Sequence, residues 1–392
     1  MRFEGDYIKI NKWLRPLSWF YGLGVNLRNQ LFELGILRSR AFSIPIISVG
    51  NITVGGTGKT PHVEYLVELL HKEKKVAVLS RGYKRKSRGY QLATADSTIR
   101  DIGDESLQIK QKYPDIYVAV DEDRCEGIDR LTADEATKDV DVILLDDAYQ
   151  HRYVRPGINI LLIDYHRLII HDTLLPAGRL REPKRGKRRA DIVIVTKCPH
   201  DLNPMEFRVL TKQLELYPYQ DLYFTNLTYG HLQQVFGGNE LPLDQIGPDT
   251  HALLLTGIAS PQQIENDLQP YVKHMESLTF ADHHYFRPKD IRRINETFGA
   301  IEGKKIIITT EKDATRLREA EGLSDDVKNA IYVLPVNIHF MLNREETFNH
   351  KISSYVLKNS RNSILVKAKD DNKSENRNHL GNGPRTISFR DN

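Results

Sequence analysis

The sequence predicts an α/β protein with a mostly parallel sheet covered by helices on both faces, followed by a smaller C-terminal α/β domain. Short, β-rich apolar runs alternate with longer mixed segments that can form helices, a pattern typical of parallel strands buried on both faces. The chain has 392 residues, which suits two domains better than one. The apolar runs expected to form the first sheet are Ile44–Val49, Val76–Leu79, Tyr117–Val120, Val140–Leu145, Ile158–Ile163 and Ile192–Val195.

Breaks in this pattern divide the chain into four parts. Prolines make residues 200–225 irregular, so we place a domain boundary near residue 220. A second α/β stretch follows, with strands expected at Ala252–Leu255 and Ile306–Thr309. From Asn359 the chain is polar and is expected to be disordered. The predicted parts are an N-terminal helix (1–40), a core domain (41–220), a smaller α/β domain (221–358) and a polar tail (359–392).

Composition and charge exclude several classes of protein. No stretch of about 18 consecutive apolar residues is present, which excludes a membrane-spanning helix. The two cysteines, Cys125 and Cys198, are too few for a disulfide framework or a cysteine-based zinc site, and they fit a reducing cytosol. Lysine and arginine total 56 against 52 aspartate and glutamate residues, and the net charge of +4 argues against a general nucleic-acid binder.

The segment Ile10–Leu37 predicts an amphipathic helix. Apolar residues recur through it, and both tryptophans of the protein, Trp13 and Trp19, lie in it among lysines and arginines. It has neither the uninterrupted apolar run nor the cleavage site of a secretory signal. We expect the helix to lie in a membrane interface, with aromatic side chains at headgroup depth and basic residues on anionic lipid. Packing of its apolar face on the protein's own core is the alternative, since amphipathicity alone does not separate the two.

A glycine-rich loop after the first predicted strand indicates a nucleotide-binding site. The loop ends in Gly58-Lys59-Thr60 before a helical segment, so it has the strand–loop–helix order of a P-loop, and the fold is expected to be P-loop NTPase-like. Its N–H groups can surround phosphate oxygens, Lys59 can neutralise the β- and γ-phosphates, and the Thr60 hydroxyl can bind Mg²⁺. Thr53 stands where the strict pattern has glycine, and a structural turn is the alternative. The residues expected to bind nucleotide are Thr53, Val54, Gly55, Gly56, Thr57, Gly58, Lys59 and Thr60.

Two aspartates, Asp146 and Asp147, follow the apolar run Val140–Leu145 and supply the acidic half of such a site. Open α/β sheets bind ligands at the carboxyl ends of their strands, where these residues fall. Successive strand side chains point in opposite directions, so a regular strand cannot aim both at one ion, and Asp146 is the better Mg²⁺ candidate. ATP is favoured over GTP, because Pro199 replaces the aspartate with which guanine-specific P-loop proteins read the base.

Two further motifs could supply a proton acceptor for phosphoryl transfer. Asp104 and Glu105 lie in an acidic turn before a predicted helix, and His283 belongs to a histidine pair flanked by aromatic residues in the second domain. An aspartate of one domain in contact with a histidine of the other would form a base only when the domains close, which excludes water. Ordinary surface residues are the alternative for each motif.

Basic residues concentrate in two segments, 81–88 and 179–189. Capture of phosphate or anionic lipid is a physical reason for such density. A solvated surface or RNA binding is the alternative, although no RNA-binding module with stacking aromatic residues is visible.

In order along the chain, these motifs resemble those of the tetraacyldisaccharide 4′-kinases of lipid A biosynthesis. The resemblance implies transfer of the γ-phosphoryl group of ATP, with Mg²⁺, to the 4′-hydroxyl of an acylated glucosamine disaccharide 1-phosphate. It also implies a peripheral enzyme at the cytoplasmic face of the inner membrane of a Gram-negative bacterium, in agreement with the predicted N-terminal helix. The motifs that carry it, from about residue 10 to about residue 345, are NITVGGTGKTP, RGYKRKSRG, GDE, DEDR, DDAYQHR, LLPAGRLREP, TGIASPQQI, FADHHYF and TTEKDATRL.

The resemblance further implies roles for the residues at matching motif positions. Asp104 looks like the catalytic base with His283 as its partner, and Lys59 keeps its P-loop role. The residues implied in organising the metal are Thr60, Asp146, Asp147, Glu105 and Glu182. The residues implied in contacting the head of the lipid disaccharide are Tyr83, Arg124, His151 and Arg181.

Two other functions remain open from the sequence. One is a membrane-peripheral, switch-type P-loop NTPase with a regulatory or delivery role, although the missing guanine-reading aspartate argues against its GTP form. The other is a basic, membrane-peripheral scaffold whose P-loop is not catalytic. Nucleic acid is not an expected partner, and the sequence does not indicate any protein partner.

Overall fold

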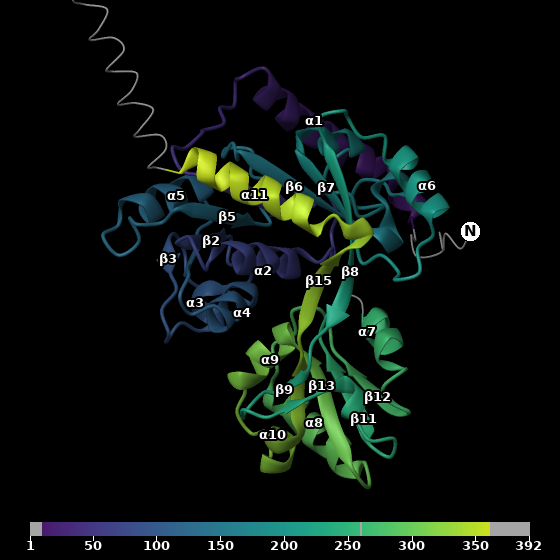
Figure 1. The fold of residues 1–392 in the computed structure, drawn as a ribbon. Coiled ribbons are helices and arrows are strands. Elements are labelled where there is room, and N and C mark those ends of the chain that lie inside the picture. The colour runs from purple at the N-terminus through teal and green to yellow at the C-terminus, as the bar shows by residue number, and fades with distance from the viewer. Residues whose placement is uncertain (1–9, 259–260, 361–392) are drawn as a thin grey trace, which may run out of the picture.

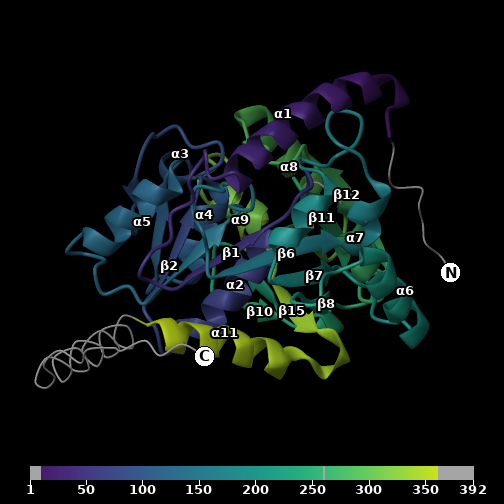
Figure 2. The same cartoon turned by 90° about the horizontal axis from the view of Figure 1, so that it is seen from above.

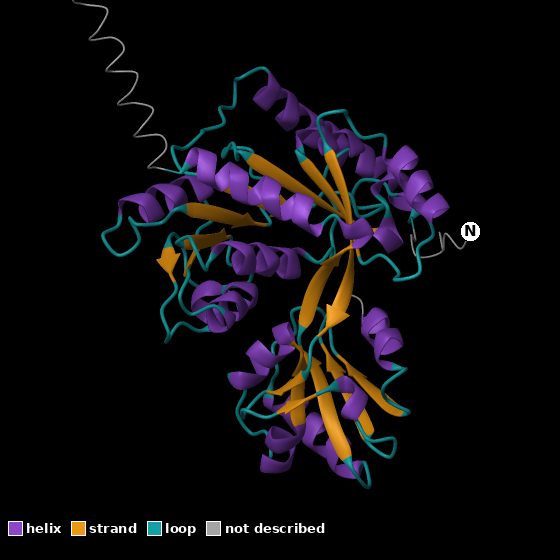
Figure 3. Cartoon of the chain, viewed as in Figure 1, coloured by secondary structure: helices purple, strands orange, loops and turns teal. Residues whose placement is uncertain are grey.

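The computed structural model describes residues 10–258 and 261–360, which form two bodies joined by a pair of strands (Figure 1). Each body is built around a β-sheet with helices beside it (Figure 3). The larger body holds a nine-stranded sheet and the smaller one a six-stranded sheet. Within the described ranges, no helix has the length and apolar character needed to cross a membrane.

The nine-stranded sheet has the order β15-β8-β7-β6-β1-β5-β2-β4-β3. Its strands are β1 (Ile46–Gly50), β2 (Val76–Ser80), β3 (Gln91–Leu92), β4 (Tyr117–Val120), β5 (Val142–Asp146), β6 (Ile158–Asp164), β7 (Ile192–Thr196), β8 (Asp221–Tyr229) and β15 (Val336–Phe340). Only the edge pairs, β15 with β8 and β3 with β4, are antiparallel. The six predicted strands of this sheet all occur, with ends that differ by no more than two residues, and the predicted mostly parallel α/β class is confirmed.

Helices cover both faces of this sheet, which explains why its central strands are apolar throughout. Leu144 and Leu145 of β5 point into the two different cores. On the Leu144 side lie α2 (Lys59–Leu70), α4 (Asp104–Lys112, after the short α3, Ile99–Ile102) and α11 (Glu345–Asn359). Figure 2 shows α2 and α11 together on one side of the strands. The opposite face is covered by α5 (Arg124–Ala133) and α6 (Pro204–Leu214).

The six-stranded sheet has the order β10-β9-β14-β13-β11-β12, with parallel pairing from β14 to β12. Its strands are β9 (Leu232–Gln234), β10 (Glu240–Leu241), β11 (His251–Thr256), β12 (His274–Thr279), β13 (Lys305–Thr310) and β14 (Ile331–Leu334). One face packs against α8 (Pro288–Ala300), α9 (Glu311–Arg318) and α10 (Asp325–Ala330), and the other against α7 (Pro261–Leu268). The predicted strands Ala252–Leu255 and Ile306–Thr309 correspond to β11 and β13.

The strands β8 and β15 carry the chain from the first body to the second and back (Figure 1). This arrangement differs from the predicted boundary near residue 220, because β8, β15 and α11 belong to the nine-stranded sheet and its core. The physical reason is that Phe340, Phe348 and Ile352 bury their side chains beside α2 in the first body. The second body is therefore inserted between two strands of the first.

The N-terminal helix α1 (Arg15–Glu33) follows a short 3₁₀ turn at Lys12–Leu14. The side chains that α1 buries are mostly small or polar, namely Ser18, Gly22, Asn29 and Phe32. Most of its large apolar side chains point outward, and the exposed large apolar residues of the segment include Trp13, Leu17, Trp19, Phe20, Leu23, Leu27, Leu34 and Ile36. This distribution is the reverse of a helix packed on a protein core, so the alternative that the apolar face covers the core is wrong. Residues 1–9 of the predicted N-terminal part and 361–392 of the predicted disordered tail lie outside the described residues.

Candidate active site

The predicted P-loop forms the turn between β1 and α2. Gly55 and Gly58 have φ angles of +114° and +79°, a backbone region that glycine adopts without steric cost. The loop is tied to its surroundings through Thr57. The Asn51 side-chain amide donates to the Thr57 hydroxyl at 2.7 Å, and the Thr196 hydroxyl donates to the Thr57 carbonyl at 3.0 Å. The loop is thereby held in shape before any phosphate arrives.

Thr53 occupies the position where the strict pattern has glycine. Its φ is not positive, so nothing there requires glycine. Its backbone forms an antiparallel bridge with Leu180, and the neighbouring Val54 N–H donates to the Arg179 carbonyl at 2.8 Å. The LPAGRLREP segment therefore flanks the P-loop.

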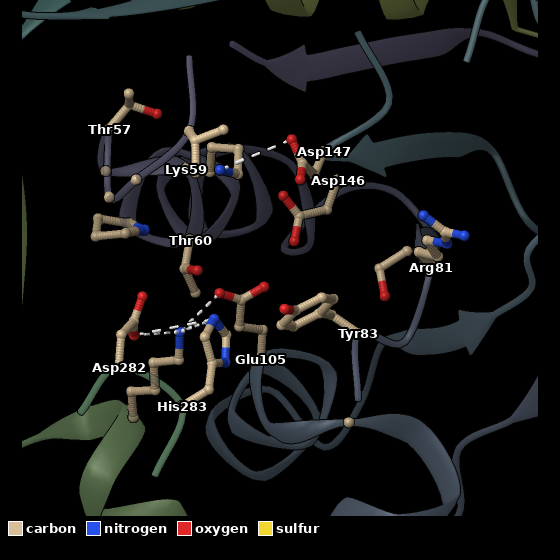
Figure 4. Close-up of a pocket in the computed structure, with 18 of the residues that line it drawn as sticks. Thr57, Lys59, Thr60, Arg81, Tyr83, Glu105, Asp146, Asp147, Asp282 and His283 are labelled. Atoms are coloured by element: carbon tan, nitrogen blue, oxygen red, sulfur yellow. Dashed lines mark hydrogen bonds and ion pairs between the residues drawn. The ribbon is translucent and has the colours of Figure 1, made fainter. Parts of the chain in front are cut away.

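Both bodies contribute to one cavity of about 880 Å³, onto which the P-loop opens (Figure 4). Of the residues that the sequence assigned to the nucleotide, the metal, the acceptor or the base, all line this cavity except Thr53 and Asp104. Arg81 of the basic segment 81–88 lines it too, but sequence reasoning missed several other lining residues, including Tyr21, Val25 and Arg28 of α1, together with Gln150, Lys197 and Lys312.

Lys59, at the start of α2, points toward Asp147 in the loop after β5 (Figure 4), and its Nζ lies 3.7 Å from Asp147 Oδ1. Arg181 Nη1 lies 3.2 Å from Asp147 Oδ2. Burial opposes ionisation of Asp147, but the charges of Lys59 and Arg181 outweigh it and lower its pKa. The φ of Asp147 is +48°, which is uncommon for a residue with a side chain and takes it out of the regular path of β5.

Asp146, the last residue of β5, is only 2% exposed, and its Oδ1 has no hydrogen-bond donor among the described residues. Burial, followed by the negative charges of Glu105 and Asp147, raises the pKa of Asp146 to about 7. A buried carboxylate oxygen without a donor, in a cavity that Glu105, Asp147 and Thr60 also line, supplies oxygen ligands of the kind that hard divalent cations bind. These residues therefore fit Mg²⁺.

Glu182 differs from Asp146, because both of its carboxylate oxygens have donors. Arg189 Nη1 lies 2.9 Å from Oε2, and Arg189 Nη2 donates to Oε1 at 3.0 Å. The Asn29 side chain of α1 adds a third contact at 3.4 Å. A cation could reach Glu182 only in competition with Arg189, so a metal-binding role for Glu182 stays a prediction.

Asp104, the first residue of α4, meets His283, which follows β12 in the other body. Nδ1 of His283 lies 3.0 Å from Asp104 Oδ2, and the Glu105 N–H donates to Asp104 Oδ1 at 2.9 Å. The predicted contact between the two domains is therefore confirmed. Burial opposes ionisation of Asp104, but the hydrogen bond from His283 and the charges of Lys312 and Arg316 outweigh it, and the pKa of Asp104 lies well below its usual value.

The two adjacent histidines have different environments. His283 faces the cavity, packs its ring 4.9 Å from that of Tyr83 and has a φ of +55°. His284 Nε2 lies 3.0 Å from Asp290, and its ring stacks on Phe280 in the second body. Sparsely populated backbone conformations gather at functional sites, so His283 is the functional candidate and His284 is structural.

The chain matches known proteins over most of its length. A family model described as tetraacyldisaccharide-1-P 4′-kinase matches residues 10–357. The chain belongs to this family. Relatives named tetraacyldisaccharide 4′-kinase include one from Phocaeicola vulgatus, 60% identical over 92% of this chain and 99% of the relative. Another, from Bacteroides thetaiotaomicron, is 53% identical over 95% of this chain and 100% of the relative.

A solved structure of the family resembles the whole fold. It is the crystal structure of the "apo" form of LpxK from Aquifex aeolicus in complex with ATP, and it covers 88% of this chain and 98% of its own. The TM-score is 0.66 at 29% sequence identity. Membership of a kinase family favours phosphoryl transfer over the switch-type NTPase and the scaffold.

In this member of the tetraacyldisaccharide 4′-kinase family, the four residues predicted to contact the lipid head share the cavity with the P-loop. Tyr83 is 55% exposed, whereas Arg124 is buried. Burial, and then the charge of Arg124, lower the pKa of His151 to about 4, so its imidazole is neutral near pH 7. Arg181 is already paired with Asp147. The contacts of these four residues with an acceptor stay predictions.

Helix α1 borders the same cavity in this kinase. The Tyr21 hydroxyl donates to the Arg181 carbonyl at 2.9 Å, and Arg28 Nη2 donates to the Gln150 carbonyl at 3.1 Å. Helix α1 therefore forms part of the cavity wall through Tyr21, Val25 and Arg28.

Sequence reasoning also assigned no role to Lys312 and Arg316 of α9, although both lie in the motif TTEKDATRL. The sequence did contain a signal for them. The motif comes at the end of an apolar strand of a parallel sheet, which is the position from which Asp146 was predicted to reach the site. A separation of four residues also places the two cations on one face of a helix.

Proposed function

We propose that the protein transfers the γ-phosphoryl group of ATP to the 4′-hydroxyl of an acylated glucosamine disaccharide 1-phosphate, a step in lipid A biosynthesis. The observation that carries the proposal is that one cavity is lined both by the P-loop with Lys59 and by His283, which is paired with Asp104. Phosphoryl transfer needs these two functions, phosphate binding and a proton acceptor, side by side.

The P-loop residues from Thr53 to Thr60 hold the triphosphate, with backbone N–H groups and Lys59 directed at its oxygens. The ATP in the related crystal structure supports this choice of nucleotide. Lys59 then exchanges part of its attraction to Asp147 for the γ-phosphoryl oxygens, where negative charge develops during transfer.

Mg²⁺ is the proposed metal, held by Asp146 and Thr60 with Asp147, Glu105 and Glu182 nearby. The unpartnered buried oxygen of Asp146 supports this assignment. When bound, the ion neutralises negative charge on the β- and γ-phosphates.

Asp104 and His283 accept the proton of the 4′-hydroxyl as a unit. Asp104 fixes the orientation of the imidazole through Nδ1, and His283 faces the acceptor because it, and not Asp104, lines the cavity. Nε2 of His283 lies 3.1 Å from Lys312 Nζ, so the acceptor hydroxyl has to displace that lysine to reach the nitrogen.

The acceptor's disaccharide head lies against Tyr83, Arg124, His151 and Arg181, and its acyl chains extend along α1 into a lipid surface. The outward apolar side chains of α1 and its border with the cavity support this orientation. The protein is then peripheral at the cytoplasmic face of the bacterial inner membrane, where an acylated acceptor would be met.

The test is an assay with purified full-length protein, labelled ATP and acylated disaccharide 1-phosphate in mixed micelles, scored for a bisphosphorylated lipid. We expect transfer that requires the acceptor and ceases when magnesium is chelated. ATP hydrolysis independent of the acceptor, with no phosphorylated lipid, would contradict the proposal and favour the switch-type NTPase.

Replacing Trp19, Phe20 and Leu23 together by serine is expected to weaken binding to anionic phospholipid vesicles by at least about tenfold, because three apolar side chains lose their contact with lipid. These residues are 66%, 63% and 56% exposed, so the fold should tolerate the change. Vesicle cosedimentation measures the effect. The control variant replaces Met205 of α6 and Leu357 of α11 by serine. These side chains are 60% and 55% exposed. Undiminished vesicle binding by the triple variant would refute the membrane role of α1.

A further inference from the structure

Arg316 is a buried cation of the second body that reaches the candidate base of the first. It lies on α9 and is 5% exposed. Its Nε donates to Asp104 Oδ2 at 3.1 Å, and its Nη2 makes a second, short contact with the same oxygen. Because two nitrogens of one guanidinium contact the carboxylate, Arg316 both orients the Asp104 side chain and stabilises its negative charge.

On the side away from Asp104, Arg316 is held by residues of the second body. Its Nη1 donates to Asp313 Oδ1 at 2.9 Å. Asp313 is fully buried, and its Oδ2 accepts from the Gly257 N–H at 2.8 Å and from the Thr310 hydroxyl at 2.7 Å. The guanidinium therefore belongs to a network built on the ends of β11 and β13, and its position follows the second body.

The contacts of Asp104 show what Arg316 contributes. Oδ2 accepts from Arg316 and from His283 Nδ1, and both donors come from the second body, whereas Oδ1 accepts the N–H of Glu105. Lys312, which can only donate, faces Nε2 of His283. These contacts fit the imidazole tautomer with its hydrogen on Nδ1, toward Asp104, and its lone pair on Nε2.

We propose that Arg316 is a positioning residue for phosphoryl transfer, which fixes the Asp104 carboxylate, and through it His283, when the two bodies are together. The proposal rests on the function proposed above. Arg316 does not line the cavity, so it acts through Asp104 and not on the substrates. Without Arg316, Asp104 would keep only the Glu105 N–H and a less constrained His283.

A purely structural ion pair between the bodies is the competing explanation, and the chain offers a matched control for it. Lys112 of α4 lies 2.6 Å from Glu64 in the first body and 2.7 Å from Glu311 in the second. It therefore bridges the same two helices, α4 and α9, as the Asp104–Arg316 pair. Lys112 does not line the cavity and contacts neither Asp104 nor His283.

The experiment compares full-length wild-type protein with the variants Arg316→Ala, Arg316→Lys and Lys112→Met in the lipid phosphorylation assay. For Arg316→Ala we expect kcat to fall by about 10²-fold, with KM for ATP within about threefold of the wild-type value. Guanidinium added to this variant should recover about tenfold in kcat. Lys112→Met should lower the melting temperature but leave kcat within about threefold of the wild-type value.

Three results would overturn the proposal: a kcat of Arg316→Ala near the wild-type value, an equal loss in Lys112→Met, or no recovery with guanidinium. If Arg316→Ala fails to fold, Arg316→Lys decides, because it keeps the charge but loses the two-nitrogen contact. Its kcat should fall by about tenfold at an unchanged melting temperature, and an unchanged kcat would overturn the proposal. Failure of the wild-type protein to phosphorylate the lipid would contradict the proposed function instead.

Discussion

Replacing Lys59 by alanine is expected to lower kcat for lipid phosphorylation by about 10³-fold. Lys59 is the cation that the P-loop places at the cavity, next to Asp147. Its removal takes away the charge that offsets the γ-phosphoryl oxygens. Among the residues that the structure describes, it also leaves Asp147 with only Arg181 as an ion-pair partner. Steady-state kinetics with labelled ATP measure the loss, and ATP affinity should fall as well.

Lys72→Ala is the matched control for Lys59→Ala. Lys72 lies two residues after the end of α2, and its side chain is 72% exposed. Among the described residues it pairs only with Glu68 of α2, 3.9 Å away. Its replacement makes the same change in charge without touching the cavity, and kcat should stay within about twofold of the wild-type value. Undiminished phosphorylation by Lys59→Ala would show that the P-loop is not the phosphate site.

Patterns confined to a short stretch of sequence predicted the core of this protein well. The central strands are buried on both faces, so each is a continuous apolar run, and the loop after Ile46–Gly50 carries glycines where the backbone adopts positive φ. Asp146 could be placed beside Lys59 because the carboxyl ends of parallel strands share one edge of the sheet.

The connection between the two bodies could not be predicted in the same way. Strand β15 pairs with β8, which is more than one hundred residues away in the sequence. The local sequence of a short amphipathic strand does not indicate which strand it will pair with. Strand β12 of the smaller sheet was missed for a related reason. His274–Thr279 is mostly exposed and polar, so it lacks the apolar run by which the buried strands were found.

The contacts of the candidate base depend on long-range packing too. Asp104 and His283 were paired from their chemistry, but Arg316, which is 212 residues from Asp104, was not. For the N-terminal helix, the sequence predicted the element but not which of its faces packs on the protein. Its amphipathic pattern was visible, but only the structure reveals that the small and polar side chains of Ser18, Gly22 and Asn29 face the protein.

Replacing Asp104 by asparagine is expected to lower kcat by about 10²–10⁴-fold while ATP affinity stays within about threefold of the wild-type value. Asparagine has nearly the same size as aspartate but lacks the negative charge with which Asp104 binds His283 Nδ1 and Arg316. Kinetics give kcat, and titration of ATP binding gives the affinity.

A loss of stability has to be separated from this loss of chemistry. Asp104→Asn removes one of the two carboxylate partners of the buried Arg316 and leaves Asp313 as the other, which should lower the free energy of unfolding by about 1–3 kcal/mol. Unfolding in denaturant measures this change in the free energy of unfolding. Retained ATP binding would show that the first body, which carries the P-loop, is still folded in the assay. The control is Asp101→Asn, because the Asp101 carboxylate is exposed and, within the described part of the chain, contacts only Thr98 at the start of α3. If Asp104→Asn kept kcat near that of Asp101→Asn, Asp104 would have no part in accepting the proton, and the contact between the two bodies would have to be explained by stability alone.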